Sequence, residues 1–267
     1  MYKLKTMWDC IDAVICITLD TATKRHVQVQ RELERVGLWP KTTMLVNKRD
    51  PQGGLRGCFE SHRKAWQLAQ DRQVKNVLIV EDDVFFSNDW QKYMPSVQNF
   101  VTHAADWDCL FLGWTPFRAR KTNWKNITKI VCGTAMHAYI VSQQALQKTL
   151  PSYDDVKMPL DVYLMCPQCP NKQRFTPLTT CMQQPNPMMH MYALKPMIAF
   201  QRYDNTSATG NDAAANRRKA RVCFMRIFGQ GAVTSDTPTL TLTFGLVFII
   251  LFAVLIALIV GTTTRLA

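Results

Sequence analysis

Three acidic residues in succession, Glu81, Asp82 and Asp83, follow the aliphatic run VLIV at residues 77–80. An uninterrupted aliphatic run is typical of a buried strand, so the three carboxylates stand where that strand ends. Like charges this close repel one another unless a cation shares the site. Oxygen ligands alone favour a hard divalent ion, Mg²⁺ or Mn²⁺. The alternative is a strand that runs into an acidic surface loop, and this run by itself does not decide between the two.

Strands and helices are predicted to alternate around these acids. The expected strands cover residues 13–19, 42–47 and 76–83. One expected helix carries Val29, Leu33 and Val36 on one face, with Thr21 or Thr23 as its cap and Gly37 at its end, and a second covers residues 58–71. Such alternation predicts an α/β fold with a parallel sheet, helices on both faces and right-handed crossovers. Ligands of such sheets bind at the carboxyl ends of the strands, where the three acids lie.

The pattern is weaker farther along the chain. Strands are expected over residues 107–113 and 135–141, and Ser142 is expected to cap a helix that stops before Pro151. Residues 151–196 are rich in Pro, Met and Cys, and their sequence predicts no particular element.

The composition indicates which kinds of partner and which cellular compartment to expect. The chain has 267 residues, 47% of them hydrophobic, which is enough for a full core. A net charge of +12 favours anionic partners. Nine cysteines, an odd number, and a start without the apolar core of a secretory signal favour a reducing compartment with thiols. The sequons at Asn126 and Asn205 would then carry no glycan.

An uncharged apolar run covers residues 242–260. As a helix it is about 28 Å long, the thickness of the hydrocarbon core of a bilayer, so it predicts a single C-terminal transmembrane helix. Five basic residues lie between 217 and 226, whereas only Arg265 follows the run. This asymmetry predicts that the large N-terminal part lies in the cytosol. The expected organisation is a globular domain over residues 1–210, a basic linker over 211–241, the membrane helix over 242–260 and a short tail over 261–267.

The block GCFESH at residues 57–62, followed by the Glu-Asp-Asp motif at 81–83 and by PLDVYL at 159–164, resembles glycosyltransferase family 25. The resemblance extends over about residues 13–207. It implies a GT-A-type, Rossmann-like α/β fold for a catalytic domain. It also implies inverting transfer of a hexose, galactose or glucose, from a UDP-sugar donor to a glycan, a lipid-linked sugar or a protein hydroxyl.

The resemblance also implies roles for the acids. In such enzymes the motif holds Mn²⁺ or Mg²⁺ on the nucleotide diphosphate, and the ion neutralises the charge that grows on the departing UDP. Asp83 is expected to be the closest ligand and a catalytic residue. Glu81 is the second candidate metal ligand, and Glu81 or Asp82 is expected to contact the ribose or metal-bound water.

Further candidate site residues lie outside the acidic motif. Ser61 and His62 match the Ser-His pair of the family and are expected to contact the diphosphate or the sugar, although His62 could instead be a hydrogen-bonded core histidine. Arg25 could meet a phosphate at the start of its helix or be an ordinary solvated arginine. Asp161 is the nominee for the base that takes the acceptor proton, with acceptor binding or helix capping as alternatives. Gln201 and Ser207 match the closing pattern of the family.

Some features depart from the family pattern. Thr18 stands where the family commonly has Asn, and residues 166–191 match nothing in it. This segment contains Cys166, Cys169, Cys181 and His190, for which a Cys₃His zinc site is conceivable beside thiols or one disulfide. The rival function is a catalytically inactive relative that serves as an adhesion or scaffold protein. Nucleic-acid binding is not expected, because the basic cluster adjoins the membrane span.

Overall fold

The computed structural model describes residues 7–165 and 189–202. The predicted linker and membrane helix, Ser207, Asn205 and the cysteines at 166, 169 and 181 lie outside these residues. Six strands form one sheet in the order β2-β1-β3-β6-β5-β7. Within the described residues, no helix combines the length and apolar character needed to cross a bilayer.

The first half of the sheet is parallel, as predicted. β1 (Ala13–Leu19) lies between β2 (Thr42–Asn47) and β3 (Asn76–Glu81) and is parallel to both. The three strands therefore end at the same edge of the sheet. The long helices α2 (Thr23–Arg35) and α3 (Gly54–Asp71) connect them.

The second half differs from the prediction of a parallel sheet. β5 (Cys109–Lys121) and β6 (Ile127–Ser142) form a long antiparallel hairpin, and β6 is also antiparallel to β3. The reason is the short connection over residues 122–126, since a few residues can join only antiparallel neighbours. Both strands extend beyond the predicted apolar runs. β7 (Met191–Leu194) pairs parallel to β5 and antiparallel to β6. The fold is thus a mixed α/β fold.

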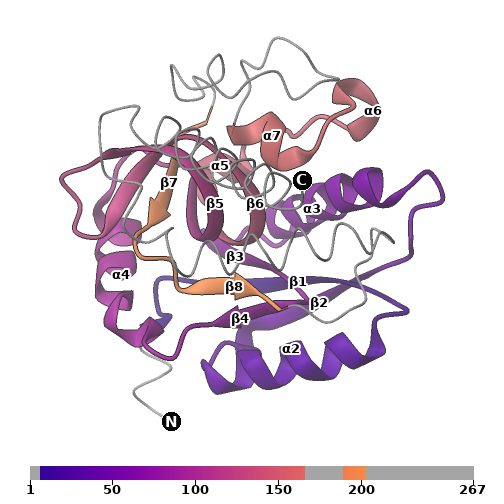
Figure 1. The fold of residues 1–267 in the computed structure, drawn as a ribbon, viewed down its shortest axis with the longest axis horizontal. Helices are drawn as coiled ribbons and strands as arrows, with labels where there is room; N and C mark the ends of the chain where they lie inside the picture. Colours follow the sequence, from indigo (N-terminus) through magenta and orange to yellow (C-terminus); the bar gives the residue numbers. More distant parts are fainter. Residues whose placement is uncertain (1–6, 166–188, 203–267) are drawn as a thin grey trace, which may run out of the picture. The chain divides into compact units, whose positions relative to one another are not determined.

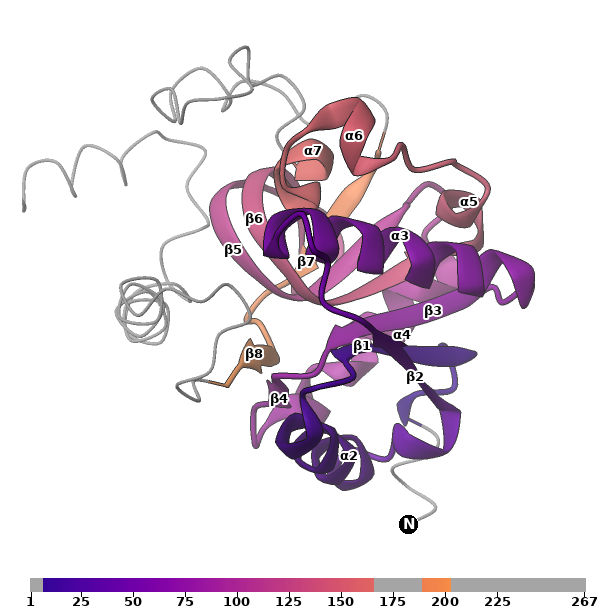
Figure 2. The same ribbon diagram turned by 90° about the vertical axis from the view of Figure 1, so that its right-hand side faces the viewer.

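Helices cover both faces of the sheet, as expected. Figures 1 and 2 show α2 and α3 on opposite sides of β1 and β2. Side chains of β1 alternate between two cores: Val14 and Cys16 pack with α2 and with α4 (Met94–His103), whereas Ile15 and Ile17 pack with α3 and with α7 (Leu160–Met165). The remaining elements are η1 (Trp39–Lys41), η2 (Trp90–Lys92), α5 (Gln143–Leu146) and α6 (Tyr153–Val156).

A second, two-stranded sheet lies beside the end of β3. β4 (Val84–Phe86) begins directly after the acidic motif and pairs antiparallel with β8 (Ala199–Gln201). Asp82 and Asp83 form the turn between β3 and β4. The pairing brings Gln201, more than a hundred residues away in the sequence, to the acidic motif.

Helix ends agree with the prediction in part. Ser142 caps α5, because its Oγ accepts from the Ala145 N–H, and Gly37 has the predicted left-handed conformation at φ 80°. The predicted threonine cap of α2 is wrong: the capping residue is Ala22, with no side-chain hydrogen bond. α3 begins at Gly54 rather than Cys58. Gly53, at φ 118°, lets the chain turn sharply into the helix, so the glycine-rich stretch forms its first turn.

Candidate active site

A cavity of about 420 Å³ opens at the carboxyl ends of β1, β2 and β3. This is the place where sheets of this kind bind their ligands. Its wall is completed by the first half of α3, the start of α7, the middle of β5 and β6, and β8. All seven predicted site residues line it: Arg25, Ser61, His62, Glu81, Asp82, Asp83 and Asp161.

Asp82 is held by two residues of the N-terminal βα unit. Thr18 Oγ1 at the end of β1 donates to Asp82 Oδ2 at 2.6 Å, and Arg25 Nη1 in the first turn of α2 donates to Asp82 Oδ1 at 2.9 Å. Thr18, which departs from the family pattern, therefore fixes the acidic motif directly. Arg25 lies in the site as predicted, and in this structure its guanidinium is ion-paired with a carboxylate.

Glu81 is oriented by two residues from other elements. Gln201 Nε2 on β8 donates to Glu81 Oε2 at 2.8 Å, and His62 Nε2 on α3 lies 3.4 Å from Glu81 Oε1. Gln201, predicted from the family's closing pattern, thus contacts the acidic motif. His62 is 2% exposed and faces inward as predicted, although it lies in the middle of α3 because that helix begins at Gly54.

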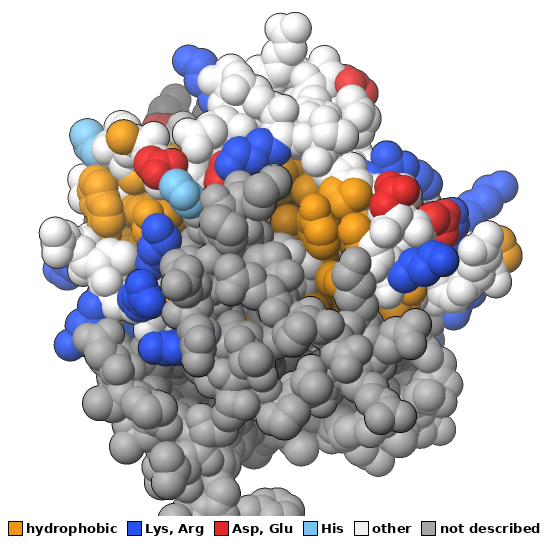
Figure 3. Space-filling view, turned by 90° about the horizontal axis from the view of Figure 1, so that it is seen from above, with side chains coloured by type: hydrophobic (Ala, Val, Ile, Leu, Met, Phe, Trp, Pro, Cys, Tyr) orange, Lys and Arg blue, Asp and Glu red, His pale blue; other side chains and the backbone are white. Residues whose placement is uncertain are grey.

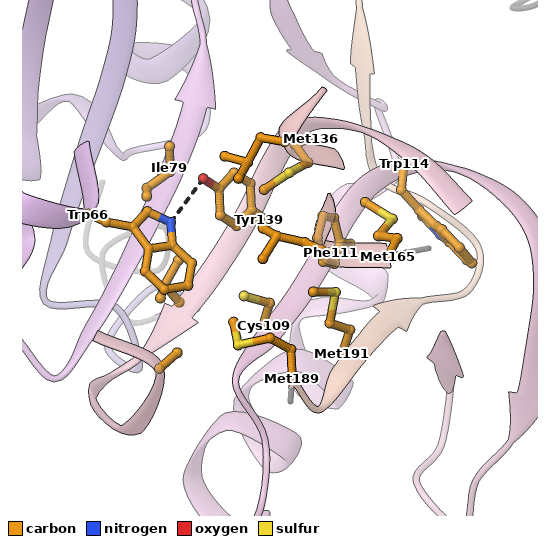
Figure 4. Packing of buried hydrophobic residues seen from close by; sticks show 14 of the residues in the cluster. Trp66, Ile79, Cys109, Phe111, Trp114, Met136, Tyr139, Met165, Met189 and Met191 are labelled. Carbon is orange, nitrogen blue, oxygen red and sulfur yellow. Dashed lines mark hydrogen bonds between the residues drawn. The ribbon is translucent and has the colours of Figure 1, made fainter. Parts of the chain in front are cut away.

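Behind His62, a buried hydrogen-bond chain extends into the core. His62 Nδ1 lies 2.9 Å from Tyr139 Oη, to which Trp66 Nε1 also donates at 3.2 Å. Figure 4 shows this indole and the tyrosine hydroxyl facing each other across the core. Burial raises the pKa of Tyr139 well above its usual value, so its hydroxyl stays protonated. Tyr139 at Nδ1 and Glu81 at Nε2 consequently hold the histidine ring in one orientation.

Ser61 and Asp83 also line the cavity. Ser61 Oγ donates to the Gly57 carbonyl at 2.6 Å, one turn earlier in α3. Asp83 is 8% exposed, and its backbone carbonyl accepts from the Arg202 N–H, which ties the turn after β3 to the end of β8. The predicted contacts of both side chains with a donor stay predictions.

Asp161 is placed by α7 at the opposite wall. Its Oδ2 accepts from the Ala135 N–H and its Oδ1 from the Val162 N–H, both at 2.8 Å. Ala135 has φ 69°, a left-handed conformation that costs a non-glycine residue about 1–2 kcal/mol. Strained residues of this kind gather at functional sites. The carboxylate therefore both supports the strained backbone of β6 at Ala135 and lines the cavity.

Sequence reasoning missed several lining residues. Lys48 and Arg49 follow β2 directly and bring positive charge to the cavity, and Trp114, Met136, Met197 and Phe200 make part of its wall apolar. The two basic residues could have been found, since they follow a predicted parallel strand at its carboxyl end. The apolar residues could not, because the sequence predicted neither the pairing of β5 with β6 nor the strand β8. On the face shown in Figure 3, hydrophobic side chains likewise lie beside acidic and basic ones.

His190 lies away from this cavity. Its Nδ1 is 2.6 Å from Asp106 Oδ2, on the segment that precedes β5. The conceivable Cys₃His zinc site would need this nitrogen or its ring partner, and its three cysteines fall outside the described residues. That site stays a prediction.

Residues 47–164 match the model of a protein family described as glycosyltransferase family 25 (LPS biosynthesis protein). Procollagen galactosyltransferase 2 of Homo sapiens is 27% identical over 134 residues, covering 45% of this chain and 21% of that protein. A relative from Rattus norvegicus named probable inactive glycosyltransferase 25 family member 3 is 25% identical over 123 residues, covering 41% of this chain and 19% of that protein.

One similar solved structure is a glycosyltransferase involved in the glycosylation of the major capsid of PBCV-1. It has 11% sequence identity and a TM-score of 0.38, over 77% of this chain and 99% of that one. The chain spans about a fifth of the length of the curated relatives it matches. The matched region contains the GCFESH block, the acidic motif and Asp161, the residues on which the resemblance was based. Residues 47–164 are therefore similar to glycosyltransferase family 25 domains.

Proposed function

We propose that this chain is a metal-assisted, inverting hexosyltransferase of GT-A-type fold. It transfers galactose or glucose from a UDP-sugar to a glycan, a lipid-linked sugar or a protein hydroxyl. The observation that carries the proposal is the cavity itself, in which three basic side chains meet the acidic motif and Asp161, both of which lie in the region that matches the family model. One wall then binds the donor and the opposite wall the acceptor.

The donor end is formed by the strand ends. Arg25, Lys48 and Arg49 supply positive charge for a diphosphate. The carboxylate chemistry of the motif fits Mn²⁺ or Mg²⁺, and Asp83, which lines the cavity, would hold the ion. When bound, the ion supplies a positive charge that stabilises the departing diphosphate. Asp82 then keeps Arg25 in place for the phosphates.

The acceptor end is formed by α7 and β6. Inversion by direct displacement needs a base on the acceptor hydroxyl. Each Asp161 oxygen accepts one backbone N–H and has a further lone pair. The carboxylate is thereby fixed in orientation and can still receive a proton at its cavity side.

UDP release from UDP-galactose and UDP-glucose tests the proposal. We expect release that requires Mn²⁺ or Mg²⁺, stops with a chelator, and falls about 10²–10³-fold in the Asp83→Ala variant. Asp71→Ala, at the exposed end of α3, is the matched control and should leave release unchanged. Release that ignores both the chelator and Asp83→Ala would overturn the proposal. Binding of the UDP-sugar without any release would favour instead the inactive, scaffold-like function; the Rattus norvegicus relative is likewise named probable inactive.

We further propose that the domain is held at a membrane by residues 242–260, with its catalytic part in the cytosol. The support is the length of the uncharged run and the basic residues before it. Protease treatment of intact vesicles tests this topology. Digestion of the domain from the outside is expected, and a domain protected in the lumen, or a glycan on Asn126, would contradict it.

A further inference from the structure

A sulfur, a nitrogen and an oxygen ligand meet at one point of the cavity wall. Cys58 and His62 lie four residues apart on α3, hence on one face of the helix, and Glu81 ends the neighbouring β3. One ligand atom of each residue lies within 4.8 Å of the other two. None of the roles described above uses the Cys58 thiol.

Two surrounding residues set the orientation of this group. The Nδ1 of His62 faces Tyr139 Oη, which leaves Nε2 on the side of Glu81. Gln201 Nε2 holds Glu81 Oε2, so that Oε1 faces the histidine. Metal-binding histidines and carboxylates are commonly held in this way by hydrogen bonds from behind. The arrangement therefore has a supporting shell as well as ligands.

The spacing fits a tetrahedral ion. With bonds of about 2.0–2.3 Å, neighbouring ligand atoms in a tetrahedral zinc site lie about 3.3–3.8 Å apart. The His62–Glu81 separation of 3.4 Å already meets this condition. The thiol reaches it with a movement of about 1 Å, which rotation of the exposed Cys58 side chain supplies.

We propose that Cys58, His62 and Glu81 form a zinc site, separate from the site of the hard ion at Asp83. A thiolate and an imidazole favour zinc and disfavour Mg²⁺ and Mn²⁺, which take oxygen ligands. Three protein ligands leave a fourth position, and it faces the cavity that all three residues line. Water or an oxygen of a bound molecule completes the coordination there. The proposal does not rest on sugar transfer.

Metal titration of the full-length chain tests this site. Zn²⁺ is measured by competition with a chromophoric chelator, and Co²⁺ by its thiolate charge-transfer absorption. We expect the wild-type chain to bind one zinc ion more than the Cys58→Ala variant, and the cobalt band of this site to be lost in that variant. The control is a chain with Cys166→Ser, Cys169→Ser and Cys181→Ser, which should keep both the zinc ion and the band.

Further variants separate ligands from supports. Glu81→Gln should keep the thiolate band and weaken zinc binding, and Gln201→Ala should weaken it about 10-fold or more because Glu81 loses its orientation. A wild-type chain that binds no zinc would overturn the proposal. So would a Cys58→Ala variant with unchanged zinc stoichiometry and affinity, or a cobalt band that disappears only in the triple cysteine variant. Mn²⁺-dependent UDP release in these variants is a separate measurement, so a failure of the zinc site and a failure of the transferase proposal remain distinguishable.

Discussion

Buried carboxylates lie at both ends of the central sheet, in opposite surroundings. At the carboxyl end of β3, Asp82 and Asp83 are 7% and 8% exposed and line the cavity. At the other end Asp108, just before β5, is fully buried and lines no part of it. Asp108 Oδ2 accepts from Lys148 Nζ at 2.7 Å and from the His190 N–H at 2.6 Å. Asp108 thereby connects Lys148, just after α5, and His190, just before β7, to the start of β5.

This comparison of Asp108 with Asp82 and Asp83 shows that burial of an acid is not by itself evidence of a functional role. A buried charge needs partners, and those partners can be purely structural, as they are for Asp108. What distinguishes the acidic motif is its cavity, together with the basic residues Arg25, Lys48 and Arg49 on the same wall. Substitutions at the two ends should accordingly affect two different quantities, the rate of transfer at one end and the free energy of unfolding at the other.

The largest expected effect is on catalysis at the cavity. Asp161→Asn keeps an acceptor oxygen for the Ala135 N–H but removes the proton-accepting carboxylate. We expect kcat for sugar transfer to fall about 10²–10⁴-fold, as for the loss of a general base. The measurement is transfer at saturating donor, with the free energy of unfolding measured on the same samples by urea.

Two results would contradict this role of Asp161. Unchanged kcat would leave Asp161 only as the support of the strained backbone at Ala135. A loss of activity that followed a loss of folded protein would make Asp161 a structural acid, comparable with Asp108. The comparison between the two ends would then no longer hold.

The next effect is on stability at the other end. Asp108→Ala leaves the His190 N–H and Lys148 without their acceptor, so we expect the free energy of unfolding to fall by about 3 kcal/mol. Transfer per folded molecule should stay unchanged. Urea denaturation measures the first quantity and activity at low temperature the second.

A neighbouring acid serves as the control for Asp108. Asp106 also pairs with His190, but its side chain is 62% exposed. Exposed pairs of this kind contribute less than about 1 kcal/mol, so Asp106→Ala should be nearly neutral. If both substitutions lowered the free energy of unfolding equally, burial would not explain the role of Asp108.

The parallel half of the sheet and the position of the acidic motif could be predicted from the sequence. The parallel β1, β2 and β3 followed from aliphatic runs, and with them the place of the acidic motif, because strand ends in a βα unit are local features. Glu81, Asp82 and Asp83 line the cavity for this reason, whereas Ser61, His62 and Asp161 were predicted from the family resemblance. The hydrogen bonds that hold these carboxylates could not be predicted from the sequence. That Thr18 holds Asp82, or that Gln201 holds Glu81, depends on pairings between segments 64 and 120 residues apart.

The later half was harder to predict for a physical reason. β5 and β6 contain charged and polar residues such as Arg118 and Lys129, so their hydrophobic pattern ends well before the strands do. Backbone pairing within the hairpin extends them beyond it, with several register shifts near the cavity. Residues such as Trp114 reach the site only through this irregular geometry.

The smallest expected effect is at Glu32, a buried acid on α2. It is 5% exposed, and its carboxylate accepts from the Phe86 N–H on β4, from Arg35 and from Arg202 after β8. Burial by itself raises the pKa of Glu32, but the hydrogen bonds from Arg35 and Phe86 outweigh it and hold the pKa below its usual value. A lowered pKa in the folded state gives stability that is present above the unfolded pKa of about 4.3 and is lost as the pH falls through the folded value.

Glu32→Gln should therefore lower the free energy of unfolding by about 1.5–2 kcal/mol at neutral pH, and this difference should shrink as the pH falls below about 4. Urea denaturation across this pH range measures it. Glu34→Gln, on the exposed side of the same helix, is the matched control and should change stability by about 0.5 kcal/mol or less at every pH. A difference for Glu32→Gln that grows towards acid pH would mean that burial prevails over the hydrogen bonds. Glu32 would then differ from Asp108, because its partners would not offset the cost of burying its charge.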